Sequence, residues 1–511
     1  MQDTENLKVR VRFAPSPTGP LHIGGVRTAL YNYLFAKKMK GSFILRVEDT
    51  DQNRYVEGAE NYIKESLEWL GLTPDEGPGY GGEYGPYRQS ERKGHYAQYA
   101  EKLVAKGHAY FAFDTPEELA KMRMDQEALG HHSPKYDRRT RMLMRNSLTL
   151  SAEETQALKE AGDNVIIRLK MPENVDITFE DKVRENVSFN TDQLDDKVIL
   201  KADGMPTYHL ANIVDDHLME ITHVIRGEEW LSSTAHHVLM YQALGWTPPT
   251  FTHLPLLLKP VGKGKLSKRD GAKFGFPVFP MKWDAGDEIY AGFKDDGYDP
   301  HALLNFLVLL GWNPGNDEEL MDVERMIDLF SLEKIVKSGA RFDFEKANWF
   351  NQQYIIATGD NQLLDNLKPF ISAEILSKFD EAYLLQVTKL MKERLNKFTD
   401  FNSAADLFFN SPSEYDAKQV KKRFNEEVLP HFDAMKLMAG SSNFSSEELS
   451  NIIKGYLNNN ELKMGTYLPL LRIMMCGSLT GPDLFDIIAL LGKEESFKRW
   501  DKALEAFKKM N

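Results

Sequence analysis

The sequence contains a single cysteine, Cys476, among its 511 residues. One thiol excludes a disulfide within the chain and any zinc site that needs several cysteines. The chain also lacks an apolar run near the roughly 18 residues that a membrane-spanning helix requires. Its first six residues are polar and acidic, unlike a signal peptide. These absences predict a cytoplasmic protein without a membrane segment.

The sequence also lacks the excess of basic residues that is typical of proteins that bind nucleic acids through their overall charge. The sequence has 63 Lys and Arg residues against 76 Asp and Glu residues, which gives a formal net charge of −13. Phosphate binding is electrostatic, so any contact with a nucleic acid must use local basic patches. The length suggests three or four domains of about 150 residues each. With 42% hydrophobic and 27% charged residues, the composition is typical of a globular protein.

The segment from Arg12 to Gly25 organises the first part of the chain. The alternating residues before Phe13 predict a strand, the Pro and Gly residues that follow break it, and a helical pattern then runs to about Lys40. Two glycines at the start of a helix would let an anion approach bare backbone N–H groups. His22 would point at that anion. The alternative is a plain strand-to-helix turn with a solvated histidine.

A second segment, Gly262 to Gly271, concentrates positive charge in an otherwise acidic chain. Its cations are Lys263, Lys265, Lys268 and Arg269. Like charges at this density repel one another unless an anion neutralises them, and the flanking glycines predict a mobile loop. The alternative is a solvated basic loop without a ligand.

Charged residues follow the apolar segments that we expect to form one parallel sheet. Glu48 follows the strand predicted over 41–47, and Arg226 ends the strand predicted near 222–226. We also expect 198–200 to return to this sheet. Ligands bind at the carboxyl ends of parallel strands, where Arg12 and Arg226 would lie. Two guanidinium groups suit a substrate with two carboxylates. The alternative is that Arg226 pairs with Glu229 on the surface and that Tyr208 is a plain core aromatic residue.

Taken together, His22-Ile23-Gly24-Gly25 and Lys265-Leu266-Ser267-Lys268-Arg269 resemble the two signature motifs of class I aminoacyl-tRNA synthetases. The flanking segments, 12–34 and 43–51, are similar to those of bacterial glutamyl-tRNA synthetases, and the resemblance extends over essentially the whole chain. It implies ATP-dependent attachment of L-glutamate to tRNA(Glu), with Mg²⁺ accompanying ATP, by a monomeric enzyme.

The resemblance also implies which residues form the site. The residues expected to bind ATP are His22, Gly24, Gly25, Glu229, Lys265, Ser267, Lys268 and Arg269, of which His22, Lys265 and Lys268 are expected to be catalytic. The residues expected to bind glutamate are Arg12, Ala14, Ser16, Glu48, Tyr208, Asn212 and Arg226. Glu48 would hold the α-ammonium group. Which arginine takes which carboxylate stays open.

The implied fold is a multidomain α/β architecture with five segments. Residues 1–107 and 204–273 would form the two halves of a Rossmann-like catalytic domain. An acceptor-binding domain would be inserted at 108–203, a helical stem-contact domain would follow at 274–350, and 351–511 would be an all-helical anticodon-binding region. Candidate RNA contacts in that region are Lys392, Arg394, Lys397, Lys418, Lys421, Lys422 and Arg423.

The expected inserted domain departs from the pattern of zinc-binding relatives. Those relatives carry Cys-x-Cys after an Ala-Tyr pair, where this chain has Ala112 and Asp114. The histidines that remain, 108, 131 and 132, are more typical of surface residues than of ligands when thiolates are absent. We therefore expect no structural zinc. The basic run formed by Lys135, Arg138, Arg139, Arg141 and Arg145 is a candidate phosphate-contacting patch or a solvated face.

Several alternatives remain at this point. A glutaminyl-tRNA synthetase would carry β-barrels in its carboxyl-terminal part, and a truncated paralogue that glutamylates a tRNA base would lack the helical third. A catalytically silent tRNA-binding paralogue would have lost the phosphate-contacting lysines. A non-discriminating enzyme that also charges tRNA(Gln) is compatible with the sequence.

Overall fold

The computed structural model describes residues 8–510, and the chain forms two compact units. The first unit comprises the chain up to Asp295 together with Pro300–Ala347. The second comprises Asp296–Asp299 and the chain from Asn348 onward. Within the described residues, no helix is both long and apolar enough to cross a membrane.

A six-stranded sheet with the order β2-β1-β8-β9-β5-β6 forms the centre of the first unit. Its strands are β1 (Arg10–Phe13), β2 (Ser42–Leu45), β5 (Asp176–Asp181), β6 (Glu185–Asn190), β8 (His223–Gly227) and β9 (Thr250–Leu254). All neighbours are parallel except β5 and β6, which form an antiparallel hairpin. Every residue of β1 and β2 is buried, as expected for parallel strands covered on both faces.

The crossover from β1 to β2 confirms the predicted strand, turn and helix. Helix α1 (Ile23–Lys38) buries an apolar face that includes Val26, Leu30 and Leu34. In the parallel register Arg10 lies opposite Ser42 and Phe13 opposite Leu45, so both strands end at the same edge of the sheet. Strand β8 joins β1 on its other side, which brings Arg12 and Arg226 toward that edge.

The expectation that 198–200 returns to the central sheet is wrong. Strand β7 (Val198–Leu200) pairs with β4 (Ile166–Leu169), which also pairs with β3 (Ala109–Ala112), in a separate antiparallel sheet. The place beside β9 is taken instead by the β5–β6 hairpin, through Asp181 opposite Phe251. An apolar run predicts a strand but does not determine which sheet it joins.

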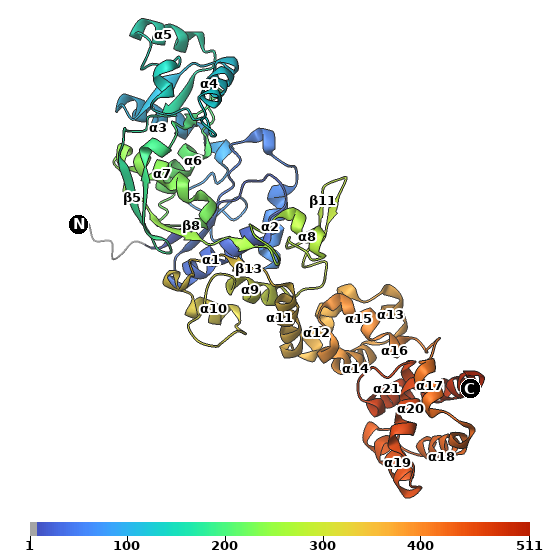
Figure 1. Cartoon of the computed structure of the whole chain (residues 1–511). Coiled ribbons are helices and arrows are strands. Elements are labelled where there is room, and N and C mark those ends of the chain that lie inside the picture. The colour runs from blue at the N-terminus through green and yellow to red at the C-terminus, as the bar shows by residue number, and fades with distance from the viewer. Residues whose placement is uncertain (1–7, 511) are drawn as a thin grey trace. The chain divides into compact units, whose positions relative to one another are not determined.

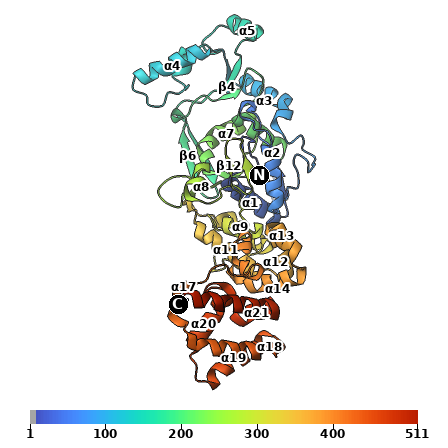
Figure 2. The same ribbon diagram turned by 90° about the vertical axis from the view of Figure 1, so that its right-hand side faces the viewer.

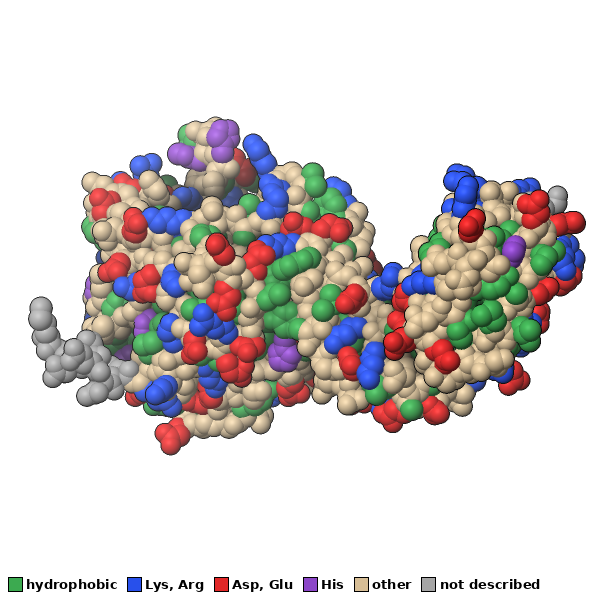
Figure 3. All heavy atoms as spheres, turned by 90° about the horizontal axis from the view of Figure 1, so that it is seen from below, with side chains coloured by type: hydrophobic (Ala, Val, Ile, Leu, Met, Phe, Trp, Pro, Cys, Tyr) green, Lys and Arg blue, Asp and Glu red, His purple; other side chains and the backbone are tan. Residues whose placement is uncertain are grey.

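Helices surround the sheets of the first unit. They are α2 (Ala59–Trp69), α3 (Lys93–Ala105), α4 (Pro116–Ala128), α5 (Ala152–Ala161), α6 (Tyr208–Leu218), α7 (Leu231–Leu244), α8 (Lys268–Phe274), α9 (Pro300–Val308) and α10 (Val323–Leu329). Within this unit, α4 and α5 lie at the end opposite α9 in both views (Figures 1 and 2), and α10 lies near α9 in Figure 1. Acidic and basic side chains are interspersed on the face of this unit drawn in Figure 3.

Two short strand pairings involve the region that the sequence predicts to be mainly helical. Strand β11 (Trp283–Asp284) pairs with β12 (Ile289–Tyr290), and β13 (Ala340–Arg341) pairs in parallel with β10 (Leu257–Leu258). The second pairing ties the end of the first unit to the segment that precedes the basic loop.

The second unit is helical over its described residues, as predicted. Its helices are the carboxyl-terminal part of α11 (Phe344–Ala357), α12 (Asp360–Leu367), α13 (Ala373–Lys378), α14 (Glu381–Met391), α15 (Phe401–Ala404), α16 (Asp406–Phe409), α17 (Ala417–Arg423), α18 (Leu429–Gly440), α19 (Ser446–Asn459), α20 (Met464–Cys476) and α21 (Leu484–Met510). A continuous apolar core that includes Phe432, Leu470 and Trp500 holds them together. Helix α21 kinks at Gly492, whose φ of 78° is not helical.

Candidate active site at the sheet edge

A cavity of about 620 Å³ opens at the carboxyl ends of β1, β2 and β8. We call it the sheet-end cavity. Its lining contains all residues predicted for the site except Arg269: Arg12, Ala14, Ser16, His22, Gly24, Gly25, Glu48, Tyr208, Asn212, Arg226, Glu229, Lys265, Ser267 and Lys268. Segments that lie far apart in the sequence therefore meet at one place, as the parallel-strand argument predicts.

His22 caps the start of α1 and lines the cavity. Its Nδ1 accepts a hydrogen bond from the backbone N–H of Gly24 at 3.1 Å. Burial lowers the pKa of His22 to about 4, and the nearby Lys265 and Lys268 contribute to this shift. The neutral ring accepts at Nδ1, so its proton must be on Nε2. That atom is buried and has no partner among the described residues, which suits a hydrogen bond to a phosphate oxygen.

The expectation of bare N–H groups at the start of α1 is wrong. The N–H of Gly24 donates to His22 Nδ1, and that of Gly25 donates to the carbonyl of His22 at 2.7 Å. The two glycines matter for space instead. A Cβ on Gly25 would come within 2.6 Å of Leu21, whereas a Cβ on Gly24, which lines the cavity, would find only ordinary contacts.

Two lysines of the basic loop reach the cavity with different partners. Lys265 Nζ lies 2.7 Å from Glu229 Oε1 in an ion pair exposed to solvent. Lys268 has no hydrogen bond or ion pair among the described residues; a Cβ on Gly19 would lie 3.1 Å from its Nζ. Burial lowers the pKa of Lys268. Of the two lysines, Lys265 is therefore paired with a carboxylate and Lys268 is not.

The basic loop is held at its base rather than freely mobile. The N–H and Oγ of Ser267 both donate to Asp270 Oδ2, at 2.7 and 2.6 Å. Arg341 Nη1 donates to the carbonyls of Lys259, Pro260 and Gly262 at 2.8 to 3.1 Å. Arg269 lies between Ser267 and Asp270 and is not part of the cavity lining.

Arg12 belongs to a buried network of charges that the sequence analysis missed. Asp216 accepts from Arg12 Nε at 3.0 Å and from Arg46 Nη1 at 2.7 Å, and Arg46 Nη2 also donates to Glu48 Oε1 at 2.9 Å. Although burial opposes ionisation, Arg12 and Arg46 lower the pKa of Asp216. Burial raises the pKa of Glu48 despite the same two guanidinium groups. The network alternates in sign and fixes Arg12 at the cavity wall.

Asn212 completes this network. Guanidinium groups can only donate, so the amide oxygen faces them, and it then accepts from Arg12 Nη2 at 3.3 Å and Arg46 Nη2 at 3.2 Å. Ala14 and Ser16 line the same wall, immediately after β1.

Arg226 is buried and is surrounded by uncharged groups. Its guanidinium donates to His253 Nε2 at 3.1 Å, Tyr208 Oη at 2.9 Å and Thr234 Oγ1 at 2.8 Å. No carboxylate of the described residues forms an ion pair with it, so the alternative of a surface pair with Glu229 is wrong. Tyr208 is not a plain core aromatic either, because its ring lies against Trp230 at the cavity and its hydroxyl contacts Arg226.

Sequence reasoning found neither Asp216 and Arg46 nor Thr234 and His253. A signal was present for Asp216, because a carboxylate on the apolar face of an amphipathic helix requires a buried partner. No sequence signal identifies that partner.

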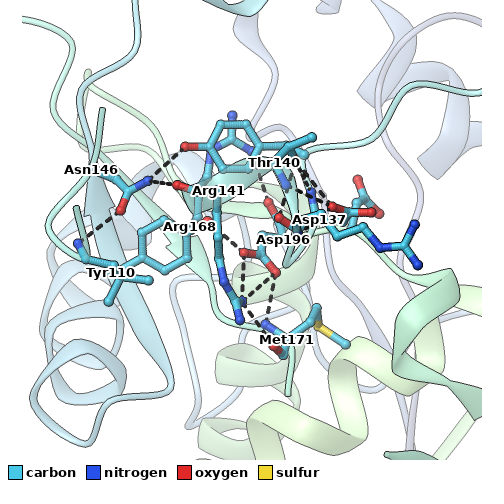
Figure 4. Close-up of polar contacts among 12 residues, drawn as sticks. Tyr110, Asp137, Thr140, Arg141, Asn146, Arg168, Met171 and Asp196 are labelled. Carbon is cyan, nitrogen blue, oxygen red and sulfur yellow. Dashed lines mark hydrogen bonds and ion pairs between the residues drawn. The ribbon is translucent and has the colours of Figure 1, made fainter. Parts of the chain in front are cut away.

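Two buried carboxylates hold together the segment 108–203, in which zinc-binding relatives carry the Cys-x-Cys motif. Asp114 accepts from Tyr136 Oη and from the N–H of Arg145, both at 2.8 Å. Asp196 accepts from Tyr110 Oη at 2.7 Å and from Arg141 Nη1 at 3.1 Å (Figure 4). Among the described residues, no group of three or more His, Cys, Asp or Glu side chains could hold a metal ion.

These contacts also show that one residue of the basic run, Arg141, was wrongly expected to be a candidate for contacting phosphate. Arg141 points inward to Asp196 and Met171 and is therefore unavailable to phosphate (Figure 4). Arg138 pairs with Asp192 at 2.7 Å. In the second unit, Lys392 and Lys397 form ion pairs with Asp360 and Asp296. Lys421 and Lys422 at the end of α17 are exposed and form no ion pair with the residues that the structure describes.

A parallel sheet with a capping histidine, a lysine loop and buried arginines at its carboxyl edge defines the catalytic domain of a class I aminoacyl-tRNA synthetase. Residues 8–349 match the family model described as tRNA synthetases class I (E and Q), catalytic domain, and residues 362–504 match an anticodon binding domain. The chain belongs to the glutamate–tRNA ligase family of these synthetases.

Relatives of nearly equal length support this assignment. A glutamate–tRNA ligase of Cytophaga hutchinsonii is 51% identical over 510 residues, covering 99% of this chain and 98% of the relative. One of Christiangramia forsetii is 50% identical over 507 residues, covering 98% and 99%. A crystal structure of a glutamate tRNA ligase from Elizabethkingia meningosepticum in complex with its amino acid has a TM-score of 0.95 at 48% identity, covering 98% of this chain and 100% of that one.

Proposed function

We propose that the sheet-end cavity activates L-glutamate with ATP and transfers it to the 3′ end of tRNA(Glu), and that the enzyme acts in the cytoplasm as a monomer. One observation carries this proposal. Two buried arginines, Arg12 and Arg226, line the same cavity as His22 and Lys268. A substrate with two carboxylates and a polyphosphate fit this arrangement of donors and cations.

In the amino-acid half of the cavity, Arg226 offers a full positive charge and Arg12 offers a charge shared with Asp216. Glu48 would receive the α-ammonium group. Its Oε1 is used by Arg46, and no described residue donates to its Oε2. Ala14, Ser16, Tyr208 and Asn212 complete this wall. Glutamine would place a neutral amide against a buried guanidinium, which leaves that charge unpaired and costs several kcal/mol.

In the nucleotide half, His22 Nε2 and Lys268 would bind phosphate oxygens. Gly24 leaves room for them, since it has no side chain. Lys265, Ser267 and Glu229 also line the cavity, and Lys265 is paired with Glu229. Glu229 would contact the ribose or adenine after giving up Lys265, which then reaches the departing pyrophosphate. Mg²⁺ would accompany the phosphates and offset their charge; we assign it no protein ligand.

The reaction needs positioning and charge compensation more than proton transfer. In the first step, an oxygen of the α-carboxylate attacks the α-phosphorus of ATP, and pyrophosphate leaves with the electrons of the broken P–O bond. A carboxylate is already ionised at pH 7, so no general base is required. In the second step, the terminal ribose 2′-OH attacks the acyl carbon of the adenylate, and AMP leaves. Donors held in place before the reaction stabilise the charge that develops.

The remaining segments would bind the tRNA. We propose residues 1–107 and 204–273 as the catalytic domain, 108–203 as an acceptor-binding insertion, 274–350 as a stem-contact region and 351–511 as the anticodon-binding region. The match of 362–504 to an anticodon binding domain supports the last of these.

Side-by-side charging of purified tRNA(Glu) and tRNA(Gln), together with glutamate-dependent pyrophosphate exchange, tests the proposal. We expect exchange with glutamate but not with glutamine, and charging of tRNA(Glu). Equal charging of both tRNAs would establish the non-discriminating alternative. Absence of exchange and of charging would establish the silent tRNA-binding alternative.

A further inference from the structure

Arg226 is held in place without a carboxylate. Its three short contacts go to His253, Tyr208 and Thr234, and His237 Nδ1 lies 3.5 Å from both terminal nitrogens, at the limit of a hydrogen bond. All four partners are uncharged, since burial lowers the pKa of both histidines, that of His253 to about 4. The N–H groups facing His237 are the least committed to the protein.

The hydrogen-bond roles of His253 follow from Arg226. A guanidinium group can only donate, so His253 Nε2 must accept from Arg226 Nε. The ring proton is therefore on Nδ1, which lies 2.6 Å from Asp181 Oδ2. The same carboxylate oxygen accepts the backbone N–H of His253 at 3.0 Å. Asp181 thus fixes both the orientation of the ring and its tautomer.

Asp181 connects this chain of contacts to the β5–β6 hairpin. It is the last residue of β5, and its other oxygen, Oδ1, accepts the N–H groups of Val183 and Arg184 at 3.0 and 2.8 Å, which closes the turn. The side chains of Asp181 and His253 are fully buried. Asp181 therefore stabilises the turn through one carboxylate oxygen and orients the buried imidazole of His253 through the other.

We propose that Asp181 and His253 are positioning residues for the substrate carboxylate, acting through Arg226. A carboxylate in direct contact with Arg226 would orient the guanidinium but neutralise it. The interposed imidazole orients it with an uncharged acceptor and keeps the negative charge of Asp181 one ring away. Arg226 consequently retains its attraction for a substrate carboxylate. This inference rests on the proposed use of Arg226 in glutamate binding.

Two substitutions of His253 separate its two hydrogen bonds. In His253→Asn the amide Nδ2 can still donate to Asp181, but the side chain is too short to accept from Arg226. In His253→Gln the longer side chain can present Oε1 to Arg226 Nε. A third variant, Asp181→Asn, keeps Oδ1 for the turn and places an N–H donor against the imidazole. This donor shifts the ring proton to Nε2, where it opposes Arg226 Nε–H.

The experiment measures pyrophosphate exchange by the full chain, with tRNA(Glu) present, as a function of glutamate and of ATP. We expect His253→Asn and Asp181→Asn to raise KM for glutamate about tenfold or more, with KM for ATP within about twofold of wild type, because a hydrogen bond to a charged group is lost at one substrate only. His253→Gln should restore a large part of the glutamate affinity. Glu180→Gln, which changes an exposed carboxylate of the same strand, is the matched control.

Unchanged kinetics in His253→Asn, an equal rise of both KM values, or a His253→Gln variant no better than His253→Asn would overturn the inference. Thermal unfolding of each variant is measured in parallel; a lower melting temperature without a selective rise of KM for glutamate assigns the pair a structural role only. If the wild-type protein itself shows no glutamate-dependent exchange, the proposed function fails and not this inference alone.

Discussion

Arg12 and Asp216 form a buried two-point ion pair, with Nε 3.0 Å from Oδ1 and Nη2 3.3 Å from Oδ2. The pair joins β1 to α6 in the wall of the sheet-end cavity. Asp216 also contacts Arg46, so the carboxylate has a second cation if Arg12 is removed. A change at Arg12 should therefore act on substrate binding more than on folding.

Replacing Arg12 with Ala should raise KM for glutamate by about 10²-fold, because a buried carboxylate of the substrate loses its counter-charge. KM for ATP should change little. Arg12→Lys keeps the charge but loses the two-point geometry, and should fall between the wild type and Arg12→Ala. Pyrophosphate exchange as a function of each substrate measures these effects. An equal loss of ATP binding would place Arg12 on the nucleotide instead.

Replacing Lys268 with Ala should slow adenylate formation by about 10²-fold, the cost of losing one pre-organised donor to the charge that develops in the transition state. Affinity for glutamate should stay near that of the wild type. Lys263→Ala is the matched control, since Lys263 belongs to the same loop but does not line the cavity. Single-turnover kinetics of activation would show the difference. Similar rates for both variants would argue against the assigned role of Lys268.

The two ring nitrogens of His22 can be tested separately. His22→Asn can keep the acceptor for the N–H of Gly24 and thus the helix cap, but it removes the donor at Nε2. His22→Gln can return a donor near that position. We expect His22→Asn to lower kcat for activation by about 10²-fold and His22→Gln by less, because the donor faces the phosphates. The reverse order would mean that the cap, not the donor, supports activity.

His223 should make the stability of the protein depend on pH. Burial lowers its pKa from 6.5 to about 4, so between these values the unfolded chain binds a proton that the folded chain does not. Its neutral form supports folding above pH 6.5, and this support is lost as the pH falls toward 4. From pH 7.5 to 5.5, the free energy of unfolding should fall by about 1 kcal/mol more in the wild type than in His223→Gln. Urea titrations at both pH values measure this difference, and an equal fall would contradict it.

Charge reversal of Lys421 and Lys422 should weaken tRNA binding and flatten its dependence on salt, because each phosphate contact contributes to the slope. The matched control reverses Lys508 and Lys509. Both pairs occupy the last turn of a helix, where cations are favoured, and Lys508 also pairs with Glu505 at 2.7 Å. Thermal unfolding of both variants is therefore measured alongside binding. Filter binding over a range of salt concentrations gives both slopes. Equal slopes would exclude the α17 pair as a phosphate contact.

The sequence predicts the elements that carry local signals. The Pro and Gly residues after Phe13 mark a turn, and the apolar period after His22 marks a helix, so the first crossover and its ligand-facing edge follow from the chain itself. The helical nature of the second unit follows from the same kind of periodicity. The resemblance predicted fifteen site residues. In the structure fourteen of them line one cavity, and Arg269 is outside its lining.

The contacts that hold these residues could not be predicted, because they join distant positions. Asp216 is 204 residues from Arg12, and Asp181 is 72 residues from His253. The sheet that β7 joins depends on which edge the β5–β6 hairpin occupies, and a short apolar run carries no such information. At the start of α1, a single side chain, His22, takes up the N–H of Gly24 that the glycine pattern left open for a ligand.

The pairing of β10 with β13 means that the basic loop depends on a distant part of the chain for its position. Arg341 lies 79 to 82 residues beyond the three loop carbonyls that it binds. If the basic loop and its neighbouring strands were grafted onto another scaffold, the hydrogen bonds from Arg341 would be lost. Conversely, the intervening chain can lengthen or shorten during evolution without disturbing the loop, provided that Arg341 still returns beside Leu258.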